Sequence, residues 1–103
     1  MSCFEFDLSI TYSLDGGKTS KTMTFTECEI ELDECYVKKS FEVKGFIEDE
    51  RDCIAVISPG DANSNEESIF ENLASYKDVF RPIIAGLVGT TYPQVFIQDI
   101  QVN

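Results

Sequence analysis

Residues Thr22–Val37 read TMTFTECEIELDECYV, and this stretch decides the fold. From Cys28 onward, apolar residues at even positions alternate with acidic residues at odd positions. Side chains of a β-strand point to opposite faces with a period of two. The stretch is therefore predicted to be a strand with one apolar face and one carboxylate face. The carboxylates of that face are Glu27, Glu29, Glu31 and Asp33, with Glu34 directly after them.

The alternation changes parity inside this strand. Met23 and Phe25 place the apolar face on odd numbers, whereas Cys28 and Ile30 place it on even numbers. One extra residue in a strand produces such a shift. We therefore predict a β-bulge near Thr26–Glu27.

The segment before this strand predicts its partner. Apolar residues from Phe4 to Tyr12 alternate with polar residues, as expected for a strand with one buried face. Asp15-Gly16-Gly17 then favours a tight hairpin, because such turns need positive φ. A turn at Gly16-Gly17 predicts the pairs Ile10–Met23, Leu8–Phe25, Phe6–Cys28 and Phe4–Ile30. On the outer face the same register places Glu5 near Glu29 and Asp7 near Glu27.

The turn sequence SLDGGKTS, residues 13–20, resembles the Asp-box hairpin of propeller blades, S-x-D-x-G-x-x-W. Ser20 stands where that motif has its aromatic residue, and 103 residues are too few for a propeller. The resemblance implies a hairpin and nothing more.

The rest of the chain predicts further strands and a helix. A third strand carries Phe41 and Val43 on its buried side, with Lys38 next to Glu27 or Glu29. Residues Cys53–Ile57 are apolar without alternation, which is typical of a strand covered on both faces. Apolar residues at helical spacing follow, and they are Ile69, Phe70, Leu73, Tyr76 and Phe80. Ser64 with Glu67, or Ser68 with Glu71, fits a capping box at the start of this helix. Pro82 is expected to kink or restart it, Gly89 to end it, and Tyr92–Val102 to form the last strand.

These elements predict a single domain over residues 1–103 of the α+β class. We expect a mainly antiparallel sheet of about five strands, whose N-terminal half is a β-hairpin, with one kinked C-terminal helix packed on one face. The acidic face would then be the one in contact with solvent.

The charge of the chain limits its partners. There are 19 acidic and 8 basic residues, which gives a formal net charge of -11. This charge opposes contact with nucleic-acid phosphates and with anionic membranes, and it favours fast association with a basic protein. The N-terminal residues carry acids and no basic region, so no signal peptide is expected and the predicted location is the cytoplasm.

The four cysteines are interpreted as small buried hydrophobic residues. Cys3, Cys28, Cys35 and Cys53 lie among apolar strand residues and lack the short paired spacings of a zinc site. A disulfide between Cys28 and Cys35, which would face each other across a hairpin, remains an alternative for an exported protein.

Two short stretches resemble functional motifs without completing them. Asp61–Asn65 resembles the start of an EF-hand calcium loop, but Glu66 replaces the required glycine and Asn72 the bidentate glutamate. Thr91–Ile97 resembles the stretch of glutaredoxins in which a cis-proline begins a strand. No C-x-x-C motif lies upstream, so no redox activity is carried over and Pro93 is interpreted as a bend.

The sequence favours a protein that is not an enzyme and holds no cofactor or metal. It contains no histidine, which excludes Ser-His and Cys-His schemes, and no glycine-rich phosphate loop. We expect it to dock carboxylates on a basic protein surface, such as the groove of a nucleic-acid-binding enzyme. Its small size and acidity resemble those of phage-encoded inhibitors of defence nucleases and of toxin immunity proteins. The candidate partner-binding residues are Glu5, Asp7, Glu27, Glu29, Glu31, Asp33 and Glu34.

The alternative function is an assembly module that forms homo-oligomers through a sheet edge. Its candidate edges are the first strand and the last strand, which contains Val95, Phe96, Ile97, Ile100 and Val102. A metal-binding or thiol-redox protein is a third, weaker alternative.

Overall fold

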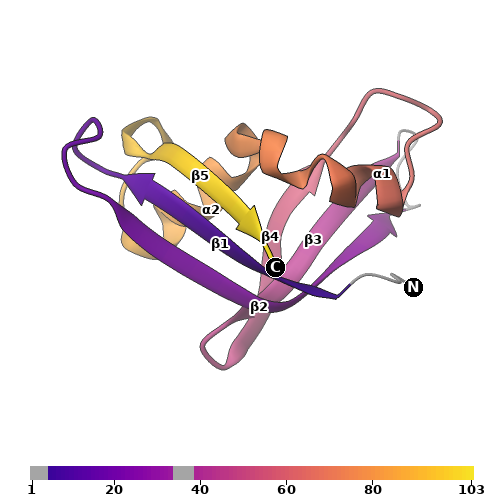
Figure 1. Cartoon of the computed structure of the whole chain (residues 1–103), viewed down its shortest axis with the longest axis horizontal. Helices are drawn as coiled ribbons and strands as arrows, with labels where there is room; N and C mark the ends of the chain where they lie inside the picture. Colours follow the sequence, from indigo (N-terminus) through magenta and orange to yellow (C-terminus); the bar gives the residue numbers. More distant parts are fainter. Residues whose placement is uncertain (1–4, 34–38) are drawn as a thin grey trace.

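The computed structural model describes residues 5–33 and 39–103. It has one five-stranded antiparallel sheet with helices packed against it, which confirms the predicted α+β class (Figure 1). The strand order is β4-β3-β2-β1-β5. The strands are β1 (Phe6–Ser13), β2 (Lys21–Asp33), β3 (Ser40–Ile47), β4 (Glu50–Ile57) and β5 (Phe96–Val102). The expectations for Cys3, Phe4, Glu34, Cys35 and Lys38 lie outside the described residues.

The predicted register of the first hairpin is confirmed. Ile10 lies opposite Met23, Leu8 opposite Phe25, and Phe6 opposite Cys28. The position of β1 corrects one expectation. Because β1 pairs with β2 on one side and β5 on the other, it is not a sheet edge. The edges among the described strands are β4 and β5.

Local hydrogen bonds between Ser13, Asp15, Gly17 and Thr19 stabilise the β1–β2 turn. The Ser13 hydroxyl donates to the Asp15 carboxylate over 2.7 Å, and the Gly17 amide donates to the Ser13 oxygen over 2.8 Å. The Thr19 amide and hydroxyl both donate to Asp15, over 2.9 and 2.6 Å. These bonds, those from Thr19 first, lower the pKa of Asp15 from 3.8 to about 2.

Asp15→Asn is expected to lose stability in a pH-dependent way. The folded-state pKa of Asp15 is depressed, so its contribution is present above the unfolded value of 3.8 and is lost as pH falls toward 2. Urea unfolding should show wild type more stable than Asp15→Asn at neutral pH, with a gap that narrows below about pH 4. Glu71→Gln, at an exposed helical position, is the control. A gap for Asp15→Asn that stays constant with pH would contradict this account of the turn.

The predicted bulge lies in the middle of β2 and bends the sheet. Glu27 has a positive φ of 51°, and the register shifts around it in both the β1–β2 and the β2–β3 pairs. The first half of β2 runs with β1, and the second half runs with β3 (Figure 1). The bulge therefore lets one strand serve two differently oriented halves of the sheet.

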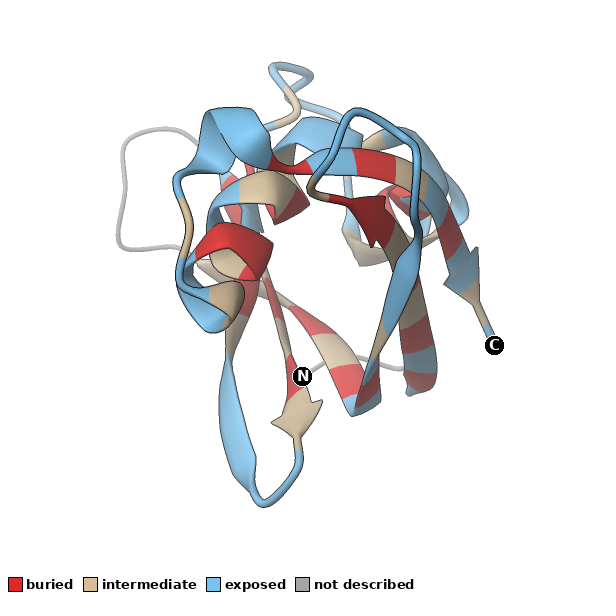
Figure 2. Cartoon of the chain, turned by 90° about the vertical axis from the view of Figure 1, so that its left-hand side faces the viewer, coloured by how far each residue is buried: buried red, intermediate tan, exposed pale blue. Residues whose placement is uncertain are grey.

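The hollow of this bent sheet holds the core, which the helices cover. Buried residues alternate with more exposed ones along β1 and along β2 after the bulge (Figure 2). Helix α2 (Lys77–Val88) contacts both edge strands, β4 and β5. The largest fully buried side chains include Phe25, Phe41, Phe80, Leu8, Ile10, Ile30, Ile57, Ile69, Leu73 and Ile84.

The predicted kinked helix corresponds to three helical pieces. They are α1 (Glu66–Glu71), the 3-10 helix η1 (Leu73–Ser75) and α2. The interruption falls at Asn72–Tyr76, and Pro82 lies inside α2. The capping box at the start of α1 is formed by Asn65 and Ser68, and not by Ser64 with Glu67 or Ser68 with Glu71.

The end of the helical segment agrees with the sequence. Gly89 ends α2 with a left-handed φ of 75°, as expected of a C-terminal glycine. A second 3-10 helix, η2 (Tyr92–Gln94), contains Pro93 and leads into β5. No peptide bond in the described ranges is cis, so Pro93 lacks the isomer found in the glutaredoxin stretch.

Candidate functional site

The outer surface of β2 presents the predicted carboxylates in two groups. The first group lies at the bulge. There the Glu27 amide donates to the Asp7 carboxylate over 3.3 Å, and the side chains of both residues are exposed. After the bulge, Cys28 and Ile30 point into the core, so Glu29 and Glu31 point outward. The change of parity therefore places the acids that follow Cys28 on the outer surface, while Glu27 lies at the bulge itself.

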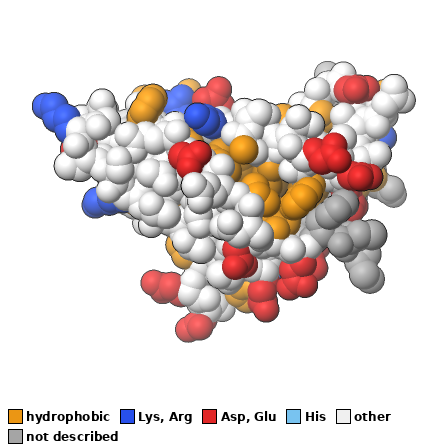
Figure 3. All heavy atoms as spheres, in the orientation of Figure 1, with side chains coloured by type: hydrophobic (Ala, Val, Ile, Leu, Met, Phe, Trp, Pro, Cys, Tyr) orange, Lys and Arg blue, Asp and Glu red, His pale blue; other side chains and the backbone are white. Residues whose placement is uncertain are grey.

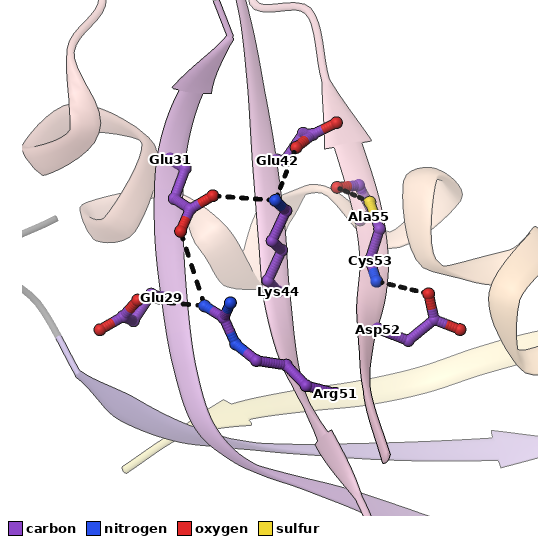
Figure 4. A network of polar contacts seen from close by, with 8 residues as sticks. All are labelled: Glu29, Glu31, Glu42, Lys44, Arg51, Asp52, Cys53 and Ala55. Atoms are coloured by element: carbon purple, nitrogen blue, oxygen red, sulfur yellow. Dashed lines mark hydrogen bonds and ion pairs between the residues drawn. The ribbon is translucent and has the colours of Figure 1, made fainter. Parts of the chain in front are cut away.

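Lys44 of β3 holds two acids that face each other. Glu31 lies directly opposite Glu42 in the β2–β3 pair, an arrangement in which like charges repel. The Lys44 ammonium lies 3.0 Å from Glu31 and 3.4 Å from Glu42, between the two carboxylates (Figure 4). The hydrogen bond from Lys44 lowers the pKa of Glu31, and the bonds to Glu31 and Glu42 raise the pKa of Lys44.

Arg51 of β4 reaches across β3 to the acids of β2. Its Nη2 lies 3.1 Å from Glu29 and 3.5 Å from Glu31 (Figure 4). Together with Lys44 it forms a network of three acids and two bases, which we call the outer-face network. Its members are Glu29, Glu31, Glu42, Lys44 and Arg51.

The outer-face network is open to solvent. Each of its side chains is roughly one third exposed, between 30% and 37%. Ion pairs at this exposure are screened by water and salt and contribute little individually. The two bases therefore offset part of the repulsion between Glu29, Glu31 and Glu42, and these acids remain available to exchange partners. The sequence analysis did not identify Lys44 and Arg51 as the bases that pair with these carboxylates.

A second group of acids lies beside the bulge and lacks such bases. Thr26 pairs with Phe46 near the end of β3, so the bulge adjoins the β3–β4 turn. This turn places Glu48, Asp49 and Glu50 in solvent. We define the acidic edge as Asp7, Glu27, Glu48, Asp49 and Glu50. Within residues 5–33 and 39–103, none of these five forms an ion pair.

The charges of the molecule are unevenly distributed. Figure 3 shows acidic side chains along the lower border, where Figure 1 places the β3–β4 turn and the bend of β2. Basic side chains in that view lie away from this border, mostly at the left end and near the top. The left end holds the β1–β2 turn, where Lys18 lies in the turn and Lys21 begins β2. An uneven distribution of this kind orients a charged partner during approach.

The predicted site residues thus have different environments. Glu5, Asp7 and Glu27 are exposed, Glu29, Glu31 and Asp33 are half-buried, and Glu34 is outside the described residues. Sequence reasoning missed the roles of Lys44 and Arg51 and the proximity of the β3–β4 turn. A signal for the turn was present, because Glu48, Asp49 and Glu50 are three consecutive acids.

Of the described cysteines, Cys28 is buried and Cys53 is half-buried. Burial, with a smaller effect of Asp7, raises the pKa of Cys28 to about 12, so its thiol stays protonated at neutral pH. Within the described ranges, no three Cys, Asp or Glu side chains group as metal ligands. In the loop that resembles a calcium site, Asp61 accepts a hydrogen bond from the Asn63 amide, and Asn65 caps α1.

Comparisons with known proteins found no relative from which a function could be inferred. None of the described helices has the length and apolar character needed to cross a membrane. The chain matches no protein-family model, no curated protein and no solved structure.

Proposed function

We propose that this chain is a non-enzymatic binding protein that docks its acidic edge on a basic surface of another protein. The observation that carries the proposal is the exposure of five carboxylates without ion pairs, on one border of the described structure. Basic residues of a partner would neutralise these acids, which steers association and fixes its orientation.

The outer-face network adds to this surface. Its ion pairs are exposed enough for Lys or Arg of a partner to replace Lys44 or Arg51 at the carboxylates. The docking surface therefore runs from the acidic edge onto Glu29 and Glu31. A nucleic-acid-binding enzyme is the proposed class of partner, because its phosphate-binding groove is already lined with Lys and Arg. Inhibition would follow from occupation of that groove.

A capture experiment in the source cells tests the proposal. The immobilised protein should retain a basic protein at about 50 mM salt and release it at about 500 mM, because screening weakens exposed charge pairs. Glu48→Lys/Glu50→Lys should retain at least about tenfold less of it. The matched control is Glu67→Lys/Glu71→Lys, which makes the same charge change at exposed positions of α1. Equal capture by all three proteins, or salt-resistant capture, would refute the proposal.

A second candidate function is self-association through β5. This strand is a sheet edge, and its first residue, Phe96, is 56% exposed. Tyr92, which precedes the strand, is 55% exposed. Exposed aromatic residues at an edge strand favour pairing with another chain. Sedimentation velocity over a range of concentrations separates the candidates. A concentration-dependent dimer that Phe96→Ser abolishes would favour the assembly function. A protein that stays monomeric at high concentration would exclude self-association and favour the docking function.

A further inference from the structure

An apolar groove lies next to the outer-face network. Its floor is the β4 segment from Cys53 to Val56, and its wall is formed by Val79, Pro82 and Ile83 of α2. Its volume of about 450 Å³ falls within the range of ligand clefts, although it is open along one side. Val56 is 51% exposed there, which is high for an apolar side chain next to a packed helix.

Acids lie along the rim of this groove. Val56 is the direct cross-strand neighbour of Glu42. Cys53 follows the exposed Asp52, and Figure 4 shows both residues. Burial is the largest cause of the raised pKa of the Cys53 thiol, and the negative charges of Glu42 and Asp52 raise it further. The two acids therefore produce a negative potential at the groove floor. Lys44 shares its single charge between Glu31 and Glu42, at 3.0 and 3.4 Å, and Arg51 points toward the acids of β2. Asp52 forms no ion pair with the described residues. The groove is therefore apolar inside and negative at its rim.

Two backbone groups at the groove floor already have side-chain partners. The Cys53 amide donates to the Asp52 carboxylate over 2.8 Å, and the Cys53 thiol donates to the Ala55 carbonyl over 3.6 Å. The register of β4 also shifts at this point, between the partners of Val43 and Lys44. A bulge and local side-chain bonds protect an edge strand from further pairing. These features favour an occupant that enters with a side chain rather than as an added strand.

We propose that this groove receives one aliphatic side chain of the basic partner, flanked on that partner by Lys or Arg. The aliphatic side chain packs on Val56 and Ile83 while its basic neighbours meet Glu42 and Asp52. Charge complementarity selects the flanking residues, and the apolar lining selects the anchor between them. This inference rests on the proposed function, because it names the contact that the docked partner makes.

Peptide titrations followed by nitrogen-15 NMR test the inference without the natural partner. The probes are acetyl-Lys-Lys-Leu-Lys-Lys-amide, the same peptide with Ser in place of Leu, and acetyl-Glu-Glu-Leu-Glu-Glu-amide. The Leu peptide should shift amide signals of Cys53–Val56 and of residues 79–83, and should bind about tenfold more tightly than the Ser peptide. The acidic peptide should cause no shifts.

Matched variants identify the groove as the origin of the Leu preference. Val56→Gln should reduce the tenfold preference to less than about twofold, whereas Leu87→Gln should preserve it, because Leu87 is 42% exposed on α2 outside the groove. Equal affinities of the Leu and Ser peptides, with shifts at Glu48–Glu50 only, would refute the proposed role of the groove. The proposal that the acidic edge docks a basic partner would still hold. Absence of shifts with both basic peptides overturns both proposals. A preference for the Leu peptide that persists in Val56→Gln would also refute the proposed role of the groove.

Discussion

Gly45→Ala is expected to destabilise the fold by about 2–3 kcal/mol, which is a large part of the stability of a small domain. A Cβ atom at Gly45 would lie 2.6 Å from the Cys28 sulfur, 2.9 Å from Ile54 Cδ1 and 3.3 Å from the Thr26 carbonyl oxygen. Gly45 therefore lets β3 approach the bulged part of β2. Equilibrium urea unfolding measures the loss.

Two further variants make this prediction specific. Cys28→Ala removes the sulfur atom closest to the new methyl group, so Gly45→Ala should cost less in that background. Gly86→Ala is the matched control, because a Cβ at Gly86 would meet no atom within 4 Å. Inside α2, it should stabilise the protein by about 0.5–1 kcal/mol. Equal effects of the two glycine substitutions would contradict the packing described around Gly45.

Glu29→Lys/Glu31→Lys is expected to have the largest effect of any charge reversal on this surface. It places two new ammonium groups beside Lys44 and Arg51, which lose the carboxylates at 3.0 and 3.1 Å. Attraction becomes repulsion among four bases on adjacent strands. The midpoint of urea unfolding should fall at low ionic strength and recover in part at about 1 M salt, where charges are screened.

The control for this reversal separates folding from docking. Glu48→Lys/Glu50→Lys makes the same change of net charge at acids that form no ion pair in the described structure. Its unfolding midpoint should stay close to that of wild type, or rise, since repulsion within the acidic edge decreases. A salt-independent midpoint for Glu29→Lys/Glu31→Lys would show that the outer-face network does not balance these charges.

The first hairpin could be predicted from the sequence in detail. Two glycines define the turn, and the change of parity between Phe25 and Cys28 locates the bulge, so the register follows from counting residues. Local signals and the burial pattern agree there. For this reason, the cross-strand pairs and the outward direction of Glu29 and Glu31 were within reach of the sequence.

The bases of the outer-face network could not be identified in the same way. Arg51 lies in a run of charged residues that reads as a turn, and its contact with Glu29 depends on the bend of β2 and on the length of β3. The position of the β3–β4 turn beside the bulge also depends on pairing between strands distant in sequence. Tertiary packing determines such contacts, and neither the hydrophobic period of a segment nor the β-propensity of its residues reports on it.

The break in the helical segment has a local cause that periodicity hides. The apolar stripe continues from Ile69 through Leu73 to Phe80, so its spacing predicts one helix. However, the Asn72 side chain donates to the Ser68 carbonyl, and the Ser75 hydroxyl donates to the Asn72 carbonyl. Short polar side chains that bond to the backbone compete with the helix in this way.

The association rate of the captured partner, measured by stopped-flow fluorescence at increasing salt, tests the docking role of the acidic edge most directly. We expect the association rate of wild type to fall steeply as ionic strength increases. Glu48→Lys/Glu50→Lys should associate at least about tenfold more slowly at low salt, whereas Glu67→Lys/Glu71→Lys should stay close to wild type. Equal rates for the two variants, or a rate of wild type that does not change with salt, would contradict it.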